Sequence, residues 1–232
     1  MTSSPGSPEY TGTVTPGGEP AVRRLGRLSV TKLAVDPQMS NNCYLLRCEQ
    51  TGEQVLVDAA DDAPRLLGLI GDGGLACVVT THQHWDHHRA LSEVVAATGA
   101  DVLAGAPDAD AITEQTGVAV ARRLEHGDTV PVGACTLSVI ALAGHTPGSI
   151  ALVYDDPDDD TSGPHLFTGD SLFPGGPGRT TTPEDFGSLM DDLEAKVFAE
   201  LPDETWFYPG HGDDSTVGAE RPQVAEWRAR GW

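Results

Sequence analysis

The chain is poor in basic side chains. Its 232 residues include 14 Lys and Arg against 35 Asp and Glu, which gives a formal net charge of -21 at pH 7. Proteins that bind nucleic acid gain much of their affinity from Lys and Arg that displace counterions from the phosphate backbone. We therefore expect no nucleic-acid partner, and the same deficit argues against nuclease functions.

Long apolar runs are also missing. No segment approaches the roughly 20 apolar residues that a membrane-spanning helix needs. Residues 1–20 are rich in Ser, Thr, Pro and Gly and lack the charged and apolar regions of a secretory signal. We expect a disordered leader over residues 1–20, no membrane partner and a cytoplasmic location.

Cysteine is scarce as well. Four cysteines lie in or beside apolar, strand-like runs and lack Cys-x-x-Cys spacing: Cys43, Cys48, Cys77 and Cys135. We expect reduced core residues rather than a disulfide framework or metal ligands. Since the length suits one sizeable core, residues 21–232 are predicted to form a single domain.

Against these absences stands one short segment that is crowded with metal-capable side chains. The run His82-Gln83-His84-Trp85-Asp86-His87 follows the apolar stretch 77–79 directly. Three imidazoles and a carboxylate held so close together are costly unless a cation binds them. The motif therefore predicts a metal site.

The rest of the chain repeats the same local pattern. Apolar runs at 76–80, 137–143, 165–168 and 205–208 each lead into a metal-capable residue, and in three of the four cases a Gly directly precedes that residue. In layered α/β folds, loops beyond the carboxyl ends of strands collect ligands and catalytic groups at one place. Seven side chains are expected to converge there: His82, His84, Asp86, His87, His145, Asp170 and His211.

Seven ligands are too many for one catalytic zinc, which takes three protein ligands and a water. The set suits two divalent ions. One ion would take His82, His84 and His145, the second Asp86, His87 and His211, and the carboxylate of Asp170 would bridge them. Zn²⁺ is the expected ion, and Fe or Mn is compatible with a His and Asp set that contains no Cys.

The motifs resemble a known family. Four segments in this order are similar to the metallo-β-lactamase superfamily, and within it to the short, single-domain glyoxalase II (hydroxyacylglutathione hydrolase) branch: 81–87, 144–148, 167–170 and 209–212. The resemblance implies an α/β layered fold, an αββα sandwich with a binuclear metal site at one sheet edge. It also implies that Asp58, at the end of an early strand, holds the His-rich segment through a ligating imidazole.

The segment after Asp170 bears on the substrate. Residues 172–179 resemble the glyoxalase II loop in which a cation meets a carboxylate of glutathione, and Arg179 occupies that position. Two features depart from the family pattern. Thr181 stands where the family often has a Tyr. Because only 21 residues follow His211, we do not expect the helical C-terminal domain of long glyoxalase II enzymes.

The predicted activity is metal-dependent hydrolysis. Two divalent ions can lower the pKa of a bridging water to about 7 and polarise a carbonyl oxygen. With Asp86 and Asp170 as the catalytic carboxylates, the resulting hydroxide would cleave a small-molecule acyl conjugate of a low-molecular-weight thiol, which makes the protein a thioesterase.

Other functions stay open at this point. A related branch comprises persulfide dioxygenases, which use one Fe(II) bound by the equivalents of His82, His145 and Asp170 or a near variant. A lactonase or β-lactamase would use the same metals on another substrate, because a fold does not select a substrate. A module that binds metal without turnover is the non-enzymatic alternative.

The periodicity of apolar residues and the positions of Gly, Pro and capping residues predict the secondary structure. Strands are expected at 28–35, 42–47, 54–58, 76–80, 101–104, 122–125, 135–141, 149–154, 165–168 and 205–208. Helices are expected at 63–70, 89–98, 107–116, 184–199 and 222–230.

Overall fold

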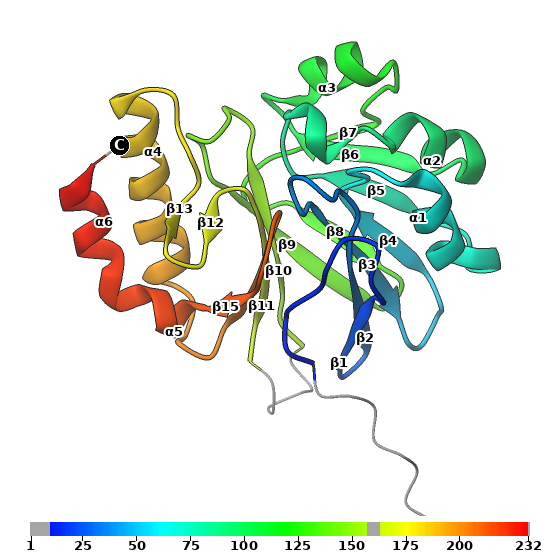
Figure 1. Cartoon of the computed structure of the whole chain (residues 1–232), viewed down its shortest axis with the longest axis horizontal. Helices are drawn as coiled ribbons and strands as arrows, with labels where there is room; N and C mark the ends of the chain where they lie inside the picture. The colour runs from blue at the N-terminus through cyan, green and yellow to red at the C-terminus, as the bar shows by residue number, and fades with distance from the viewer. Residues whose placement is uncertain (1–9, 157–162, 232) are drawn as a thin grey trace, which may run out of the picture.

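Two β-sheets pack face to face, and helices cover the outer face of each sheet (Figure 1). The structure is a computed structural model, and it describes residues 10–156 and 163–231. The four layers confirm the predicted αββα sandwich.

The first sheet has an antiparallel half and a parallel half. Strands β1 to β4 pair antiparallel, whereas β4 to β7 pair parallel. In the described chain its order is β1 (Ala21–Leu25), β2 (Leu28–Ala34), β3 (Asn42–Cys48), β4 (Gln54–Val57), β5 (Cys77–Thr80), β6 (Asp101–Gly105) and β7 (Arg122–Leu124). The crossovers of the parallel half contain α1 (Ala63–Ile70), α2 (Leu91–Thr98) and α3 (Ala109–Thr116).

The second sheet is mostly antiparallel, with β11 and β14 as a parallel pair. Its order within residues 10–156 and 163–231 is β15 (Ser215–Thr216), β14 (Trp206–Pro209), β11 (His165–Gly169), β10 (Ile150–Tyr154), β9 (Cys135–Ala141) and β8 (Thr129–Val132). A small hairpin, β12 (Leu172–Phe173) and β13 (Gly176–Pro177), precedes α4 (Pro183–Leu193). The chain continues through α5 (Val217–Glu220) to α6 (Val224–Arg230).

The core follows the alternation of side chains along each strand. On β4, Val55 and Val57 face the second sheet, while Leu56 packs beneath the helices of the first sheet. On the opposite side of the molecule, Trp227 of α6 and Leu189 of α4 pack on the outer face of the second sheet. The central strands β4, β5 and β10 are therefore covered on both faces, which explains why they read as nearly continuous apolar runs.

Some elements differ from the expected ones. Strand β8 was not among the expected strands. It contains Pro131, and a proline within a run argues against a strand unless that strand lies at the edge of a sheet, as β8 does. The expected helix at 184–199 is α4 followed by a π-helical segment, Glu194–Phe198. The two-residue strands β12, β13 and β15 are too short to leave a periodic signal.

The start of the described chain lies against the domain. The ring of Tyr10 packs edge-on to Trp206 with centroids 6.1 Å apart, and its hydroxyl donates to Asp214 Oδ2 at 2.7 Å. We expected residues 10–20 to belong to the disordered leader. The contacts of Tyr10 instead hold this segment on the domain, and a single aromatic residue has little effect on the average composition from which disorder was predicted. Residues 1–9 of the expected leader lie outside the described residues.

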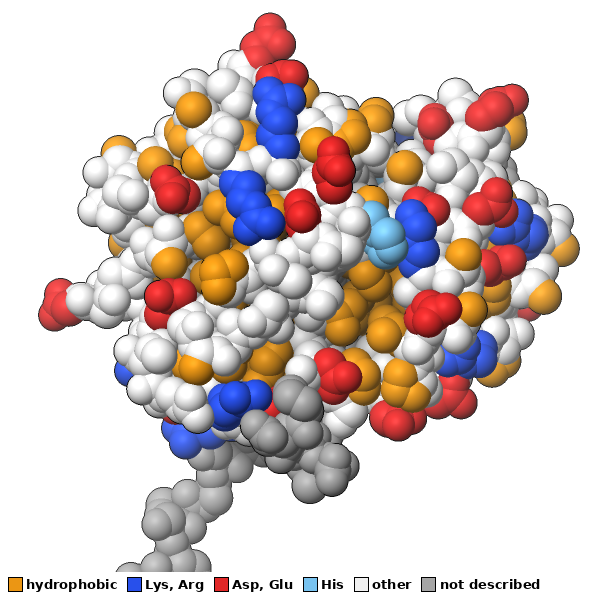
Figure 2. All heavy atoms as spheres, turned by 180° about the vertical axis from the view of Figure 1, so that it is seen from behind, with side chains coloured by type: hydrophobic (Ala, Val, Ile, Leu, Met, Phe, Trp, Pro, Cys, Tyr) orange, Lys and Arg blue, Asp and Glu red, His pale blue; other side chains and the backbone are white. Residues whose placement is uncertain are grey.

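All four cysteines are buried and free, as predicted from their spacing. In the described residues we find no helix that is long and apolar enough to cross a membrane. Acidic and basic side chains are scattered over the face shown in Figure 2, with uncharged surface between them.

Candidate metal centre

The candidate ligands lie just beyond the carboxyl ends of strands that run in the same direction. β9, β11 and β14 share one direction in the second sheet, and they lead to His145, Asp170 and His211. In the first sheet β5 leads into the segment 82–87, which we call the His-rich loop. The two sheets therefore deliver their ligands to one edge of the sandwich, as the strand-end pattern predicted.

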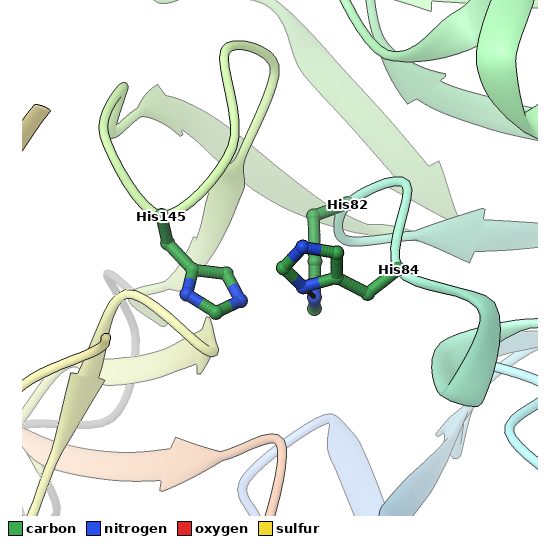
Figure 3. A group of neighbouring side chains, drawn as sticks. All are labelled: His82, His84 and His145. Atoms are coloured by element: carbon green, nitrogen blue, oxygen red, sulfur yellow. Dashed lines mark hydrogen bonds between the residues drawn. The ribbon is translucent and has the colours of Figure 1, made fainter. Parts of the chain in front are cut away.

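Three imidazoles form one cluster, which we call the three-histidine group: His82, His84 and His145. Figure 3 shows the rings of His82 and His84 facing that of His145 across a gap between two loops. His82 Nε2 lies 3.1 Å from His84 Nδ1, and one nitrogen from each ring lies within 4.8 Å of the others. Such a set of three nitrogen ligands could hold a metal ion.

A second cluster, which we call the mixed group, contains Asp86, His87 and His211. Its ligand atoms also lie within 4.8 Å of one another. His211 Nε2 lies 3.2 Å from His87 Nε2 and 3.4 Å from Asp86 Oδ2. Two imidazoles and a carboxylate form a second set that is suited to a divalent ion.

Asp170 connects the two groups. Its Oδ1 lies 3.3 Å from His87 Nε2, and its Oδ2 lies 3.3 Å from His211 Nε2 and 3.7 Å from His145 Nε2. Oδ2 thus lies near one imidazole of each group, and Oδ1 faces His87 of the mixed group. All seven side chains that the sequence predicted to converge are brought together at this point.

The donor atoms are arranged for a cation. Three imidazoles each donate a hydrogen bond from Nδ1–H. His87 donates to Asp58, His145 to the carbonyl oxygen of Arg179 and His211 to the carbonyl oxygen of Met39. An Nδ1–H that is held in this way leaves the lone pair of Nε2 directed into the centre. Among the described residues, His145 Nε2 and Asp170 Oδ1 are buried and form no hydrogen bond. The residues therefore fit a metal ion.

The electrostatics differ between the two groups. Burial lowers the pKa of His82 and of His145, so both rings are neutral, as metal ligands must be. Burial acts in the same direction on His211, but Asp170 and Asp86 outweigh it and raise the pKa to about 9, so a bound metal ion would have to displace a proton from this ring. Burial would raise the pKa of Asp170, yet the neighbouring imidazoles hold it well below the usual range, so this carboxylate is ionised.

Asp58 holds the His-rich loop through hydrogen bonds. It follows β4 with φ at 58°, in the left-handed region, and it is almost fully buried. Its carboxylate accepts hydrogen bonds from the backbone and hydroxyl of Thr81 at 2.8 Å each, and from His87 Nδ1 at 2.8 Å. The backbone conformation is costly for a residue other than glycine, and it aims the carboxylate at the base of the His-rich loop.

A residue that the sequence analysis missed lies beside the mixed group. Asn41 is fully buried, and its amide donates to Asp86 Oδ2 at 2.9 Å. It also pairs through its backbone with His211, on the loop that follows β14. The only signal in the sequence is a pair of polar residues in front of the apolar strand β3, and such a pair more often marks a turn.

The side chain of Arg179 lies outside the ligand cluster. Its guanidinium is exposed and lines a cavity of about 380 Å³ together with Phe186 and Arg230. The backbone of Arg179 belongs to the centre, because its carbonyl accepts from His145. Arg179 could be named from the sequence, whereas no motif indicated Arg230, which lies in the last turn of α6.

Comparison with known proteins agrees with this geometry. The chain is 36% identical to a hydroxyacylglutathione hydrolase-like protein of Mus musculus, and the match covers 78% of this chain and 61% of the relative. A crystal structure of ETHE1 from Myxococcus xanthus superposes with a TM-score of 0.71 at 32% identity and covers 85% of this chain and 84% of that one. A protein solved in a di-iron-bound form gives a TM-score of 0.63 at 29% identity, with 82% and 96% covered.

The chain spans about three fifths of the length of the mouse relative. Its family assignment depends on a different match. A family model described as the metallo-beta-lactamase superfamily matches residues 36–211, which include all seven candidate ligands and most of both sheets. The chain therefore belongs to the metallo-beta-lactamase superfamily.

Proposed function

We propose that the protein is a binuclear metal-dependent hydrolase, a thioesterase that cleaves acyl conjugates of a low-molecular-weight thiol. The observation that carries the proposal is the pair of ligand groups on either side of Asp170, whose Oδ2 lies 3.3 Å from His211 of one group and 3.7 Å from His145 of the other. The three-histidine group would hold one ion and the mixed group the other, with zinc as the proposed metal. The similarity to a hydroxyacylglutathione hydrolase-like protein supports a thioester as the substrate.

When bound, a pair of divalent ions lowers the pKa of a water molecule and polarises the carbonyl to be attacked. The chain supplies the remaining elements. Asp170 stays ionised and lies between the two groups, where it would hold bound cations and balance part of their charge. Asn41 holds one oxygen of Asp86 at 2.9 Å and so orients this carboxylate. The donors are thus preorganised before substrate arrives.

The cavity lined by Arg179 and Arg230 is the proposed site for the thiol carrier. The peptide of Gly178 joins it to the centre, since a Cβ at this position would lie 1.7 Å from the carbonyl oxygen of Asp170. Neither guanidinium forms an ion pair or hydrogen bond with any described residue, in a chain that has only 14 Lys and Arg. Two unpaired cations at the edge of the centre favour a carrier with an anionic group.

Substitution Arg230→Ala is expected to raise KM for an acyl thioester with a carboxylate-bearing carrier by about 10-fold, with kcat nearly unchanged. Loss of a contact made equally in the ground state and transition state gives this pattern, and a hydrogen bond to a charged group is worth about 1.5 kcal/mol or more. Steady-state kinetics with S-acetylglutathione and with its diethyl ester would measure the effect. Only the free acid should respond.

The matched control is Arg228→Ala on the same helix. Arg228 pairs with Asp191 and Glu194 of the α4 region and does not line the cavity. It should therefore leave KM for both thioesters unchanged. If the two substitutions change KM equally, the proposal that the carrier binds in this cavity is wrong.

Metal analysis tests the central part of the proposal. We expect close to two divalent ions per chain in the purified protein, and hydrolysis of acyl thioesters that is lost with a chelator and restored by added metal. A protein that hydrolyses no member of a panel of acyl thioesters while fully loaded with metal would contradict the thioesterase assignment.

The two groups make a further prediction about individual ligands. His84→Ala and His211→Ala should each reduce the metal content from about two ions per chain to about one, because each imidazole belongs to a different group. Isothermal titration of the metal-free variants would show which binding step has disappeared. Loss of both ions from either single variant would mean that the groups do not bind independently.

A specific observation favours one alternative. His82, His87 and Asp170 form a third group, which differs from the expected His82, His145 and Asp170 by one histidine. Two histidines with one carboxylate are the ligand set of many Fe(II) oxygenases. This set suits the persulfide dioxygenase considered from the sequence. A single iron per chain, with His211→Ala leaving metal content and activity intact, would replace the hydrolase by this alternative.

A further inference from the structure

Asp108 occupies the N-cap position of α3 and does not cap the helix. An Asp at this position ordinarily accepts a hydrogen bond from a backbone N–H in the first turn, which stabilises the helix. Here the side chain makes no such bond, although it is completely buried. Its carboxylate is directed away from its own helix.

The carboxylate accepts hydrogen bonds from the two loops that carry the three-histidine group. Asp108 Oδ2 accepts from the backbone N–H of Gln83 at 2.9 Å and from the hydroxyl of Thr146 at 2.6 Å. Asp108 Oδ1 accepts from the backbone N–H of Gly148 at 2.8 Å. Gln83 separates two of the histidines, and Thr146 follows the third.

The contact is tightly packed. A Cβ on Gly148 would lie 2.5 Å from the backbone nitrogen of Asp108 and 2.7 Å from its Cγ. A Cβ on Gly105 would in turn lie 2.0 Å from the carbonyl oxygen of Gly148. The loop after His145 is thus pressed against the carboxylate, and a larger residue at either glycine would force the two apart.

We propose that Asp108 is the positioning residue of the three-histidine group, which it fixes by joining the His-rich loop to the loop of His145. It acts through the two loops themselves, since its carboxylate accepts from Gln83, Thr146 and Gly148 rather than from any imidazole. Asp58 plays the corresponding part for the mixed group, because His87 is the one ligand imidazole that it contacts directly; its bonds to Thr81 hold the start of the His-rich loop. The inference rests on the proposed metal binding and adds that each group has its own buried carboxylate.

The conservative substitution Asp108→Asn tests this division. An amide has the shape of the carboxylate but presents an NH₂ group in place of one oxygen. Whichever way it is turned, that NH₂ faces a backbone N–H, of Gln83 in one orientation and of Gly148 in the other. One of the two loops must therefore move, and the three imidazoles no longer point at one metal position.

We expect Asp108→Asn to lower the affinity of one metal site by about 10- to 100-fold, the usual effect of removing a group that orients ligands. The second site should keep its affinity. Titration of the metal-free protein with zinc against a competing chelator would measure both. Cobalt substitution would add the visible absorption of each occupied site, and His84→Ala and His211→Ala would identify the two sites.

Asp110→Asn is the matched control. Asp110 lies on the same helix, is exposed, and pairs with Arg123 alone among the described residues. The control variant should bind both ions like the wild-type protein. Thr146→Val removes one of the three donors to Asp108 and should weaken the same site as Asp108→Asn, to a smaller extent.

Equal weakening of both sites, or two sites of wild-type affinity in Asp108→Asn, would overturn the inference. If that variant does not fold, Thr146→Val decides the matter, because wild-type affinity at both sites would overturn it as well. A wild-type protein that binds no metal would instead overturn the proposed function, and the inference with it. Two sites in the wild type and an unaffected Asp108→Asn would overturn the inference alone.

Discussion

Asp170→Asn is expected to lower turnover by about 100- to 1000-fold, which is the usual cost of losing one preorganised electrostatic group. The change in KM should be much smaller. Asp170 Oδ2 lies 3.3 Å from His211 Nε2 in the mixed group and 3.7 Å from His145 Nε2 in the three-histidine group. A neutral amide would balance the charge of two cations poorly and would turn an NH₂ group toward one of them.

Metal analysis must accompany the kinetics, because loss of an ion would lower turnover for a different reason. The clearest result is a variant that keeps about two ions per chain and has lost turnover. Asp203→Asn is a suitable control, since this carboxylate is largely exposed, pairs with Arg221 and belongs to none of the ligand groups. Near wild-type turnover in Asp170→Asn would remove this residue from its place between the two metals.

Much of the centre could be predicted because its ligands are encoded locally. Each follows an apolar run that ends in a turn, and strands of one direction end at one edge of a sheet. His82, His145, Asp170 and His211 could therefore be assigned to a common site without knowledge of which strands are neighbours. The four-layer fold rested on the resemblance, which the structure confirms.

The residues that position these ligands could not be found in the same way. Asp108 precedes a helix, and its type and place predict an ordinary N-cap. Its partners Gln83 and Thr146 are 25 and 38 residues away. Asn41 reaches Asp86 across 45 residues. Contacts of this kind depend on how loops from different strands meet, and no periodicity in the sequence records that.

Lys32 is another example, because a lysine inside the apolar strand β2 gives no indication of its partner. Its side chain is fully buried and its Nζ lies 2.6 Å from Asp214 Oδ1, which is fully buried as well. Nζ also donates to the carbonyl oxygens of Gly12 and Gly212. One ammonium group thus ties the start of the described chain to the loop that carries His211.

We expect Lys32→Met to lower the free energy of unfolding by about 3 to 5 kcal/mol, because removal of one partner leaves a buried charge without compensation. Burial already raises the pKa of Asp214, with Lys32 opposing that effect, so this carboxylate would be pushed further toward its neutral form. Urea denaturation at neutral pH would measure the loss. Arg123→Met, which breaks an exposed pair with Asp110, should leave the unfolding curve close to that of the wild type.

The double variant Lys32→Met with Asp214→Asn separates the charge effect from the loss of packing. The remaining partners of Asp214 do not require its charge, since the hydroxyl of Tyr10 and the indole N–H of Trp206 both donate to one of its oxygens. An amide oxygen can still accept from them, and no buried charge remains. The double variant should therefore be more stable than Lys32→Met alone. If it is equally unstable, the ammonium acts through its hydrogen bonds to Gly12 and Gly212, and the His211 loop depends on Lys32 for its shape rather than for its charge.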